Sequence, residues 1–375
     1  MKTMPLEALD VFGTNAPEYI IEEVSDFNPV PDTGAVRYRA ELEPEVFLDA
    51  MVINKQSDIL VVGFHGALNQ EKAQLPRFER MSTIRGYEVS SMFFGDPSLW
   101  KSKDLQLSWY TGWDGVDVHR IVADWAVAVA RAIGAKKIMF TGSSGGGFAA
   151  LQISSLVPGS MALVFNAQTD IAQYRVNGEG YGPQRAYVNI VWPEIARSFT
   201  SNGDIQNPAW ADAVGDRSSA VERYSSPTEN HVFIVQNTEE FHNEDHYLPF
   251  LAAAERGENL GRVKTKTYLD GPMHAQPRAP MFIETLEEAL TWAETLPPTF
   301  PERLDDMRIS IIDASSNETH DGTISDAFAS FAISLDIPAF EVEAKALRDL
   351  WLGGEGRGDE ALLLCASLGV TVSQD

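Results

Sequence analysis

The sequence of 375 residues contains a single cysteine, Cys365, in an apolar stretch near its C-terminal end. One cysteine excludes a disulfide within the chain and argues against a cysteine-based metal site, so a buried, inert thiol is the default reading. Apolar runs of the roughly 18 residues that a membrane-spanning helix needs are also missing. The N-terminus has no basic start followed by an apolar core. We therefore expect a soluble, cytoplasmic protein without a signal peptide.

Basic residues are scarce, with 29 Lys and Arg against 54 Asp and Glu, which gives a formal net charge of -25. A surface this acidic repels nucleic-acid phosphates and anionic lipids. We therefore expect neither nucleic acid nor membrane as a partner, and we interpret the charge mainly as a source of solubility. Hydrophobic residues still make up 44% of the chain, which is enough for a sizeable core. The expected partner is a small-molecule or acyl substrate, and the oligomeric state stays open.

Strand-like and helix-like patterns alternate along most of the chain. Short apolar runs typical of covered strands occur in 58–66, 87–97, 136–142, 161–170, 231–238 and 263–271, with two further strands in 36–53. Apolar residues at helical spacing occur in 115–135, in 145–159, and near 244–256 and 280–295. This alternation predicts an α/β fold with a mostly parallel central sheet and helices on both faces.

Two segments interrupt the alternation. Residues 171–229 are rich in Gly, Pro, Asn and Ser with scattered aromatic residues, and we interpret them as an inserted lid within a domain of residues 1–295. The second is the proline-rich stretch "LPPTFPERLDD" (296–306), which marks a domain boundary. Helical patterns near 324–335 and 341–352 then predict a C-terminal, mainly helical appendage within 296–375.

The stretch "FTGSSGGGFAAL" contains a G-x-S-x-G motif centred on Ser144, between a predicted strand and a predicted helix. This is the context of a nucleophile elbow, a turn so sharp that glycine is needed two residues before and after the serine, here Gly142 and Gly146. The turn exposes the hydroxyl at the carboxyl edge of the sheet and points the first N–H groups of the helix at it. Ser144 is the expected nucleophile, and the N–H of Gly145 an oxyanion donor.

A glycine-rich turn after a strand can also bind phosphate. A Walker loop requires Gly-Lys-Ser/Thr at its end, whereas Gly147 is followed by Phe148. A dinucleotide-binding turn requires a glycine where Ser144 stands, and it normally follows the first strand. Nucleotide binding and a purely structural glycine turn remain the weaker alternatives.

A serine nucleophile needs a histidine base and an acid that orients the base, each following a later strand of this fold. His274 lies in the loop after the strand pattern 263–271, and Glu240 lies just after the strand pattern 231–238. The expected catalytic residues are therefore Ser144, His274 and Glu240. The acids that remain as alternatives are Glu239 and Asp245, with Asp270 in reserve.

A second oxyanion donor usually comes from the loop after an early strand. The stretch "VVGFHGAL" ends a buried strand at His65 and Gly66, so the backbone N–H of Gly66 or Ala67 is the expected donor. Removing one such donor typically costs about 3–4 kcal/mol of transition-state stabilisation.

These motifs resemble those of the α/β-hydrolase-fold superfamily. The resemblance covers about residues 35–295 and includes His65-Gly66, the Ser144 elbow, Glu240 and His274. Within it, "GSSGGGFAAL" and "VQNTEEFHNEDHYLPF" resemble α/β-hydrolase-like proteins associated with bacterial surface glycans. The resemblance implies acyl transfer to water or another acceptor without a metal or organic cofactor. The chain departs from the usual pattern in its Glu acid and its glycine-rich elbow.

Three further groups of residues are candidates for binding. The stretch "HNEDH" (242–246) places two histidines on one helix face, but it matches no zinc motif and we expect packing or capping rather than a metal. Aromatic residues before the helix of 115–135, with His65, are candidates for lining a substrate pocket: Trp109, Tyr110 and Trp113. Arg175 and Arg185 are candidates for holding a substrate carboxylate, although a solvated surface is the simpler interpretation.

Three functions follow as hypotheses. The first is a serine hydrolase that cleaves an ester, thioester or amide through a Ser-His-Glu triad and an acyl-enzyme, with a carboxylic ester as the foremost substrate class. The second is an acyltransferase or glycan-processing protein that uses the same site. The third is a non-catalytic binding module that has kept the fold.

Overall fold

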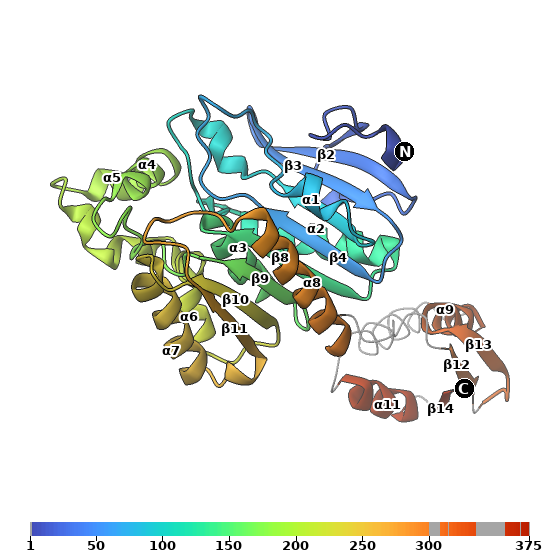
Figure 1. Ribbon diagram of the computed structural model, residues 1–375. Helices are drawn as coiled ribbons and strands as arrows, with labels where there is room; N and C mark the ends of the chain where they lie inside the picture. The colour runs from blue at the N-terminus through green and yellow to red at the C-terminus, as the bar shows by residue number, and fades with distance from the viewer. Residues whose placement is uncertain (1, 300–307, 314, 335–356, 368, 375) are drawn as a thin grey trace. The chain divides into compact units, whose positions relative to one another are not determined.

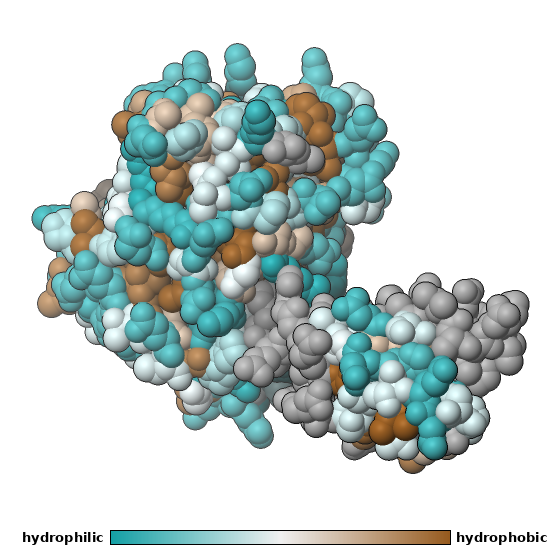
Figure 2. All heavy atoms as spheres, turned by 90° about the vertical axis from the view of Figure 1, so that its right-hand side faces the viewer, coloured by the Kyte–Doolittle hydropathy of each residue, from teal (hydrophilic) through white to brown (hydrophobic). Residues whose placement is uncertain are grey.

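The computed structural model describes residues 2–299, 308–313, 315–334, 357–367 and 369–374 (Figure 1). The chain divides into two compact units, Met1–Thr299 and Phe300–Asp375. No helix within the described ranges is long and apolar enough to cross a membrane. On the face shown in Figure 2, hydrophobic side chains form small groups among hydrophilic ones.

A nine-stranded sheet forms the centre of the first unit, with the order β1-β2-β3-β5-β4-β8-β9-β10-β11. Only the β2–β3 and β3–β5 pairs are antiparallel, and the other neighbours are parallel. The predicted mostly parallel sheet is confirmed. The strands are β1 (Glu18–Ile21), β2 (Gly34–Glu43), β3 (Val46–Asn54), β4 (Ile59–Phe64), β5 (Ser90–Phe94), β8 (Lys137–Ser143), β9 (Met161–Phe165), β10 (His231–Asn237) and β11 (Val263–Tyr268).

Helices cover both faces of this sheet, with α8 in front of it and α3 behind it in Figure 1. Alternate residues of the central strands, such as Met139 and Phe165, pack with Phe282 and Leu286 of α8 in one buried cluster. The intervening residues of these strands face the opposite side of the sheet, where Phe140 stacks with Phe64. The α-helices of this unit outside residues 171–229 are α1 (Met81–Ile84), α2 (Val118–Ile133), α3 (Gly145–Ser154), α7 (Leu248–Arg256) and α8 (Ala279–Thr295).

The segment 171–229 is largely helical and packs on the loop before α2. Its helices are α4 (Gly182–Val191), α5 (Pro193–Ser198) and α6 (Ala220–Tyr224), joined by short 3-10 turns. The buried Trp192 indole donates to the Tyr187 hydroxyl at 2.7 Å, and that hydroxyl lies 2.8 Å from Thr111 Oγ1. Arg217 donates to the carbonyls of Thr111 and Val116. Val116 begins the second strand of a small hairpin, formed by β6 (Gly112–Trp113) and β7 (Val116–Asp117).

The second unit contains strands that the sequence did not lead us to expect. Its described residues form a three-stranded antiparallel sheet of β12 (Arg308–Asp313), β13 (Thr319–Thr323) and β14 (Val370–Gln374). The helices α9 (Ile324–Ser334) and α11 (Arg357–Ser367) accompany it, whereas the helix expected near 341–352 lies outside the described residues. Cys365 is buried in the core of this unit.

Candidate active site

Ser144 occupies the sharp turn between β8 and α3, as the motif predicts. Its backbone has φ 55° and ψ -121°, a region that residues with a side chain rarely adopt. The amide of Ser144 donates to the Phe165 carbonyl at the end of β9, at 3.0 Å. Ser144 is partly exposed.

Close backbone contacts explain the two glycines that flank the turn. A Cβ atom on Gly142 would lie 2.3 Å from the Gly146 carbonyl oxygen, and one on Gly146 would lie 2.6 Å from the Phe64 carbonyl oxygen. Both distances are shorter than a carbon–oxygen contact allows, so a larger residue at either position would push the turn open. The second contact also brings the start of α3 against the end of β4.

That contact places the loop after β4 beside the nucleophile. A Cβ atom on Gly66 would lie 3.6 Å from Ser144 Cβ and 3.8 Å from the Gly145 nitrogen. Gly145 is the first residue of α3, where an amide has no partner within the helix. Gly66 and Gly145 therefore lie side by side next to Ser144, while Ala67 is exposed.

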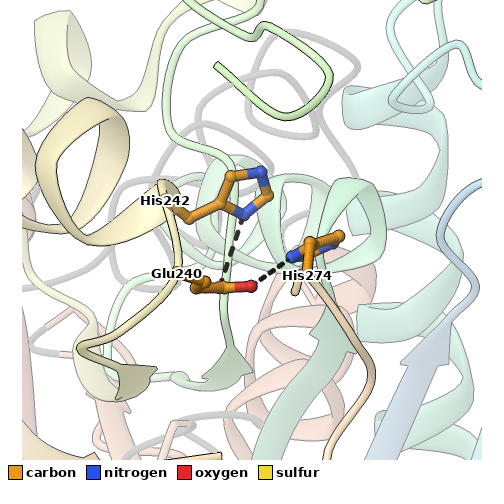
Figure 3. Close-up of side chains that lie close together, drawn as sticks. All are labelled: Glu240, His242 and His274. Carbon is orange, nitrogen blue, oxygen red and sulfur yellow. Dashed lines mark hydrogen bonds and ion pairs between the residues drawn. The ribbon is translucent and has the colours of Figure 1, made fainter. Parts of the chain in front are cut away.

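Glu240 and His274 come together from the loops after β10 and β11 (Figure 3). The Nδ1 atom of His274 lies 2.7 Å from Glu240 Oε2. A carboxylate oxygen accepts this bond, so Nδ1 carries the proton, and in the neutral imidazole the lone pair is on Nε2. The Glu240 side chain is fully buried, whereas His274 is 22% exposed. The Gln236 amide donates to the other carboxylate oxygen at 3.1 Å, which fixes the orientation of the acid.

The three alternative acids have other partners. Glu239 Oε2 accepts from the Gly271 amide at 2.7 Å and so supports the loop that leads to His274. Asp245 pairs with Arg175 at 3.2 Å, and Asp270 pairs with Arg278 at 2.6 Å. Arg175 is thus engaged within the protein, and Arg185 donates to a backbone carbonyl of the inserted segment.

Gln168, which the sequence did not single out, contacts the nucleophile. Its Nε2 donates to Ser144 Oγ at 3.1 Å, and its Oε1 accepts from the indole N–H of Trp109. The Ser144 hydroxyl forms no hydrogen bond to His274 among the described side chains. Catalytic hydrogen bonds are often longer without substrate and close in the complex.

Asn166, also missed, connects the loops of His274 and Glu240. Its Nδ2 donates to the Ala275 carbonyl at 3.0 Å, next to His274, and its Oδ1 accepts from the Asn237 amide at 2.8 Å. The Asn166 carbonyl faces His242 Nδ1 at 3.0 Å. Both missed residues fall in the predicted strand 161–170, which ends at Phe165, so the polar letters "NAQTD" belong to a loop at the sheet edge.

The two histidines of "HNEDH" are fully buried beside His274. The His242 ring centroid lies 4.1 Å from that of His274 and 4.8 Å from that of His246. Burial lowers the pKa of His242 well below its ordinary value and lowers that of His246 to about 3, so both rings stay neutral. Glu240, His242 and His274 offer ligand-type atoms within 4.8 Å of one another. The Asn166 carbonyl accepts from the Nδ1–H of His242, which fixes the tautomer of that ring.

The four residues expected to line a substrate pocket are buried in the interior. His65 Nε2 accepts from the Asp96 amide at 3.1 Å, and its Nδ1 contacts the Gly66 carbonyl at 2.7 Å. The Tyr110 hydroxyl accepts from the His65 amide and donates to the Phe94 carbonyl. Trp109 reaches Gln168, while Trp113 is buried under the Lys101 ammonium group. The contacts of His65 and Tyr110 hold the start of the loop after β4.

Acid should destabilise the fold through His119, whose Nε2–H donates to the Trp109 carbonyl at 3.0 Å. Burial lowers its pKa to about 4, whereas an unfolded imidazole titrates near 6.5. Between these values the unfolded chain binds a proton that the folded chain does not, so stability falls as the pH falls. His119→Gln keeps a donor but does not titrate, and we expect it to reduce this slope by about 1.4 kcal/mol per pH unit. Urea unfolding at pH 4–7 measures both slopes, and equal slopes would contradict the assignment.

These observations define the fold class. In the sheet, β3 is the one strand that runs antiparallel to its neighbours. A crossover places β5 between β3 and β4, and the serine turn follows β8. A serine at this turn, an acid after β10 and a histidine after β11 follow the chain order of the α/β-hydrolases. The chain has the α/β-hydrolase fold.

No protein-family model and no curated protein matches the chain. Several solved structures are similar to it. Carboxyl esterase 2 from Tuber melanosporum is 15% identical, with a TM-score of 0.45, and the match covers 72% of this chain and 92% of that one. The capsule O-acetyltransferase of Neisseria meningitidis serogroup A is 14% identical with a TM-score of 0.47, over 68% and 94%. Dipeptidyl peptidase 4 of Porphyromonas gingivalis is 12% identical with a TM-score of 0.48, over 70% of this chain and 36% of its own. The chain thus spans about a third of that peptidase, and the likeness is one of fold.

Proposed function

We propose that this protein is a serine hydrolase that cleaves an ester, thioester or amide through an acyl-enzyme, with carboxylic esters as the first substrates to test. The observation that carries the proposal is the pairing of His274 with the buried Glu240 at 2.7 Å, on the two loops that follow the strands after the Ser144 turn. Three residues in the required order, each at the carboxyl edge of the sheet, support a triad more strongly than the glycine motif does alone.

In the proposed reaction, Ser144 Oγ attacks the carbonyl carbon and passes its proton to His274 Nε2. The amides of Gly145 and of Gly66 or Ala67 stabilise the negative charge that develops on the carbonyl oxygen. His274 then protonates the leaving group as the carbon–heteroatom bond breaks, which leaves an acyl group on Ser144. Water, deprotonated by His274, attacks this ester and releases the acid. Glu240 holds the tautomer and orientation of His274 throughout.

The surroundings of His274 suggest a substrate with an apolar portion. Met273, immediately before His274, is 67% exposed, and Leu269 in the same loop is 73% exposed. Exposed apolar side chains next to a reactive group often contact the non-reacting part of a ligand. The inserted segment 171–229 is proposed to cover the substrate and to select it.

A panel of p-nitrophenyl esters, acyl thioesters and peptide anilides tests this proposal, with and without alcohol or sugar acceptors. We expect free acid from the esters as the fastest product. An acylated acceptor that forms faster than free acid would favour the acyltransferase hypothesis instead. The absence of any turnover by the folded protein across the panel would favour a binding module.

Asn166→Asp should impair the proposed reaction by disturbing the loop of His274. The carboxylate keeps the acceptor for the Asn237 amide but has no proton to donate to the Ala275 carbonyl. The Tyr268 hydroxyl, which accepts from Asn166 Nδ2 at 2.7 Å, can turn and donate to the carboxylate instead. We expect a fall of about ten-fold or more in kcat with a smaller change in KM, in proportion to one lost hydrogen bond at the site. The matched control is Asn230→Asp, because Asn230 is an equally buried amide that bonds Ser154 and Tyr224 instead. Equal effects of the two variants on kcat would contradict this role.

A further inference from the structure

The amide of Gln168 has a fixed orientation. Its side chain is fully buried between Trp109 and Ser144. An indole N–H can only donate, so the Gln168 atom that faces Trp109 must be the oxygen. The nitrogen must then face Ser144 Oγ, and the hydrogen bond at 3.1 Å runs from Gln168 to the serine and cannot be reversed.

This direction determines what the serine hydroxyl can do with its own proton. A hydroxyl has one proton and two lone pairs, and the Gln168 N–H occupies one lone pair. The proton cannot point at Gln168, because that group is itself a donor. It is therefore available to His274 Nε2, and the second lone pair is available to a carbonyl carbon. The proton and the two lone pairs of the Ser144 hydroxyl thus each face a different group.

The segment that anchors Trp109 is strained and strongly braced. Trp109 and Tyr110 both have left-handed backbones, with φ 55° and φ 57°, which two consecutive aromatic residues rarely adopt. The buried Asp96 carboxylate holds this turn by accepting from the Tyr110 amide at 3.0 Å and from the Ser108 hydroxyl at 2.7 Å. Strained backbone that persists under such bracing is typical of functional sites. Here its result is to aim one indole N–H at Gln168.

We propose that Gln168 is a fourth catalytic residue, an obligatory donor to the nucleophile oxygen, and that Trp109 is the positioning residue that fixes its amide. This inference rests on the proposed hydrolase function. During acylation the Oγ–H bond breaks toward His274 while the Gln168 N–H stays on the other lone pair. During deacylation the same N–H stabilises Oγ as the carbon–Oγ bond breaks and His274 returns the proton.

Gln168→Glu and Gln168→Met test the direction of the hydrogen bond. The carboxylate keeps the shape and the acceptor for Trp109 but, once ionised, draws the serine proton away from His274, whereas Met removes both bonds. We expect Gln168→Met to lose about ten-fold in kcat/KM, and Gln168→Glu to lose more at pH 8. The wild-type rate should rise with pH to a plateau, and that of Gln168→Glu should rise and then fall as the new carboxylate ionises. A merely structural role predicts the reverse ranking and an unchanged pH profile, and that result would overturn the proposal.

Two pairs of variants separate the chemistry from folding. Gln152→Met removes another fully buried glutamine amide, on α3, and Trp125→Phe removes another buried indole N–H, on α2. We expect both to keep wild-type kcat/KM with a lowered Tm, while Trp109→Phe loses several-fold in kcat/KM. A crystal structure of the wild type tests the inference even if no substrate is turned over. Ser144 Oγ found away from Gln168 Nε2 would overturn it, whereas an intact contact in a protein that hydrolyses nothing would overturn the hydrolase proposal alone.

Discussion

Replacing Ser144 with Ala is expected to reduce ester hydrolysis by at least about 10⁴-fold, because the proposed mechanism has no other nucleophile. The rate that remains should reflect oxyanion stabilisation and substrate binding by the intact site. Steady-state kinetics with the best ester of the panel measure the loss. The variant leaves the buried Gln168 amide without its acceptor, so we expect a modest fall in Tm while the fold is kept.

Ser143→Ala is the matched control for this variant. Ser143 is the last residue of β8, one position before the elbow, and it pairs with Phe165 through its backbone. The proposed mechanism gives its hydroxyl no part, so the control should keep most of the wild-type rate. If Ser143→Ala is inactive while Ser144→Ala retains activity, the assignment of the nucleophile is wrong.

Glu240→Gln should have the second largest effect, with a fall of about 10³–10⁴-fold in kcat. A glutamine at this position can offer its NH2 group to His274 Nδ1, which moves the imidazole proton to Nε2 and removes the lone pair that accepts the serine proton. The geometry of the loop should survive, because the substitution is isosteric. Comparing kcat and Tm of the variant with those of the wild type separates lost chemistry from lost stability.

Glu239→Gln provides the comparison next to it in the chain. Glu239 accepts from the Gly271 amide, and an amide oxygen can take over that bond. The proposed assignment therefore predicts a far smaller loss for Glu239→Gln than for Glu240→Gln. The opposite ranking would transfer the role of the acid to Glu239.

The parts of the fold that follow from local pattern were predictable. Buried parallel strands are continuous apolar runs bounded by turns, so the central strands, the Ser144 turn and the helices around it follow from the sequence. Chain order then placed the acid and the base after the two later strands. The choice of Glu240 over its neighbour Glu239 used its distance from the strand end and the place where the resembled family usually has its acid. The structure shows that the two acids have different partners, His274 and Gly271.

The residues that were missed depend on contacts between distant loops. Gln168 meets Trp109 across 59 positions, and Asn166 meets Ala275 across 109, so no local period reports either contact. The predicted strand 161–170 also extended past Phe165 and so concealed both residues within it. The same limit applies to Trp109 and Tyr110, because hydrophobic composition alone cannot separate a wall facing substrate from buried support behind the site.

The measurement that tests the central claim most directly is labelling of the folded wild-type protein with a fluorophosphonate, followed by intact-mass analysis and peptide mapping. The proposed triad predicts one adduct per chain on Ser144, retained in Ser143→Ala and lost in Ser144→Ala and after unfolding. A folded protein that forms no adduct, or one labelled at a residue other than Ser144, would contradict the proposal that Ser144 is an activated nucleophile.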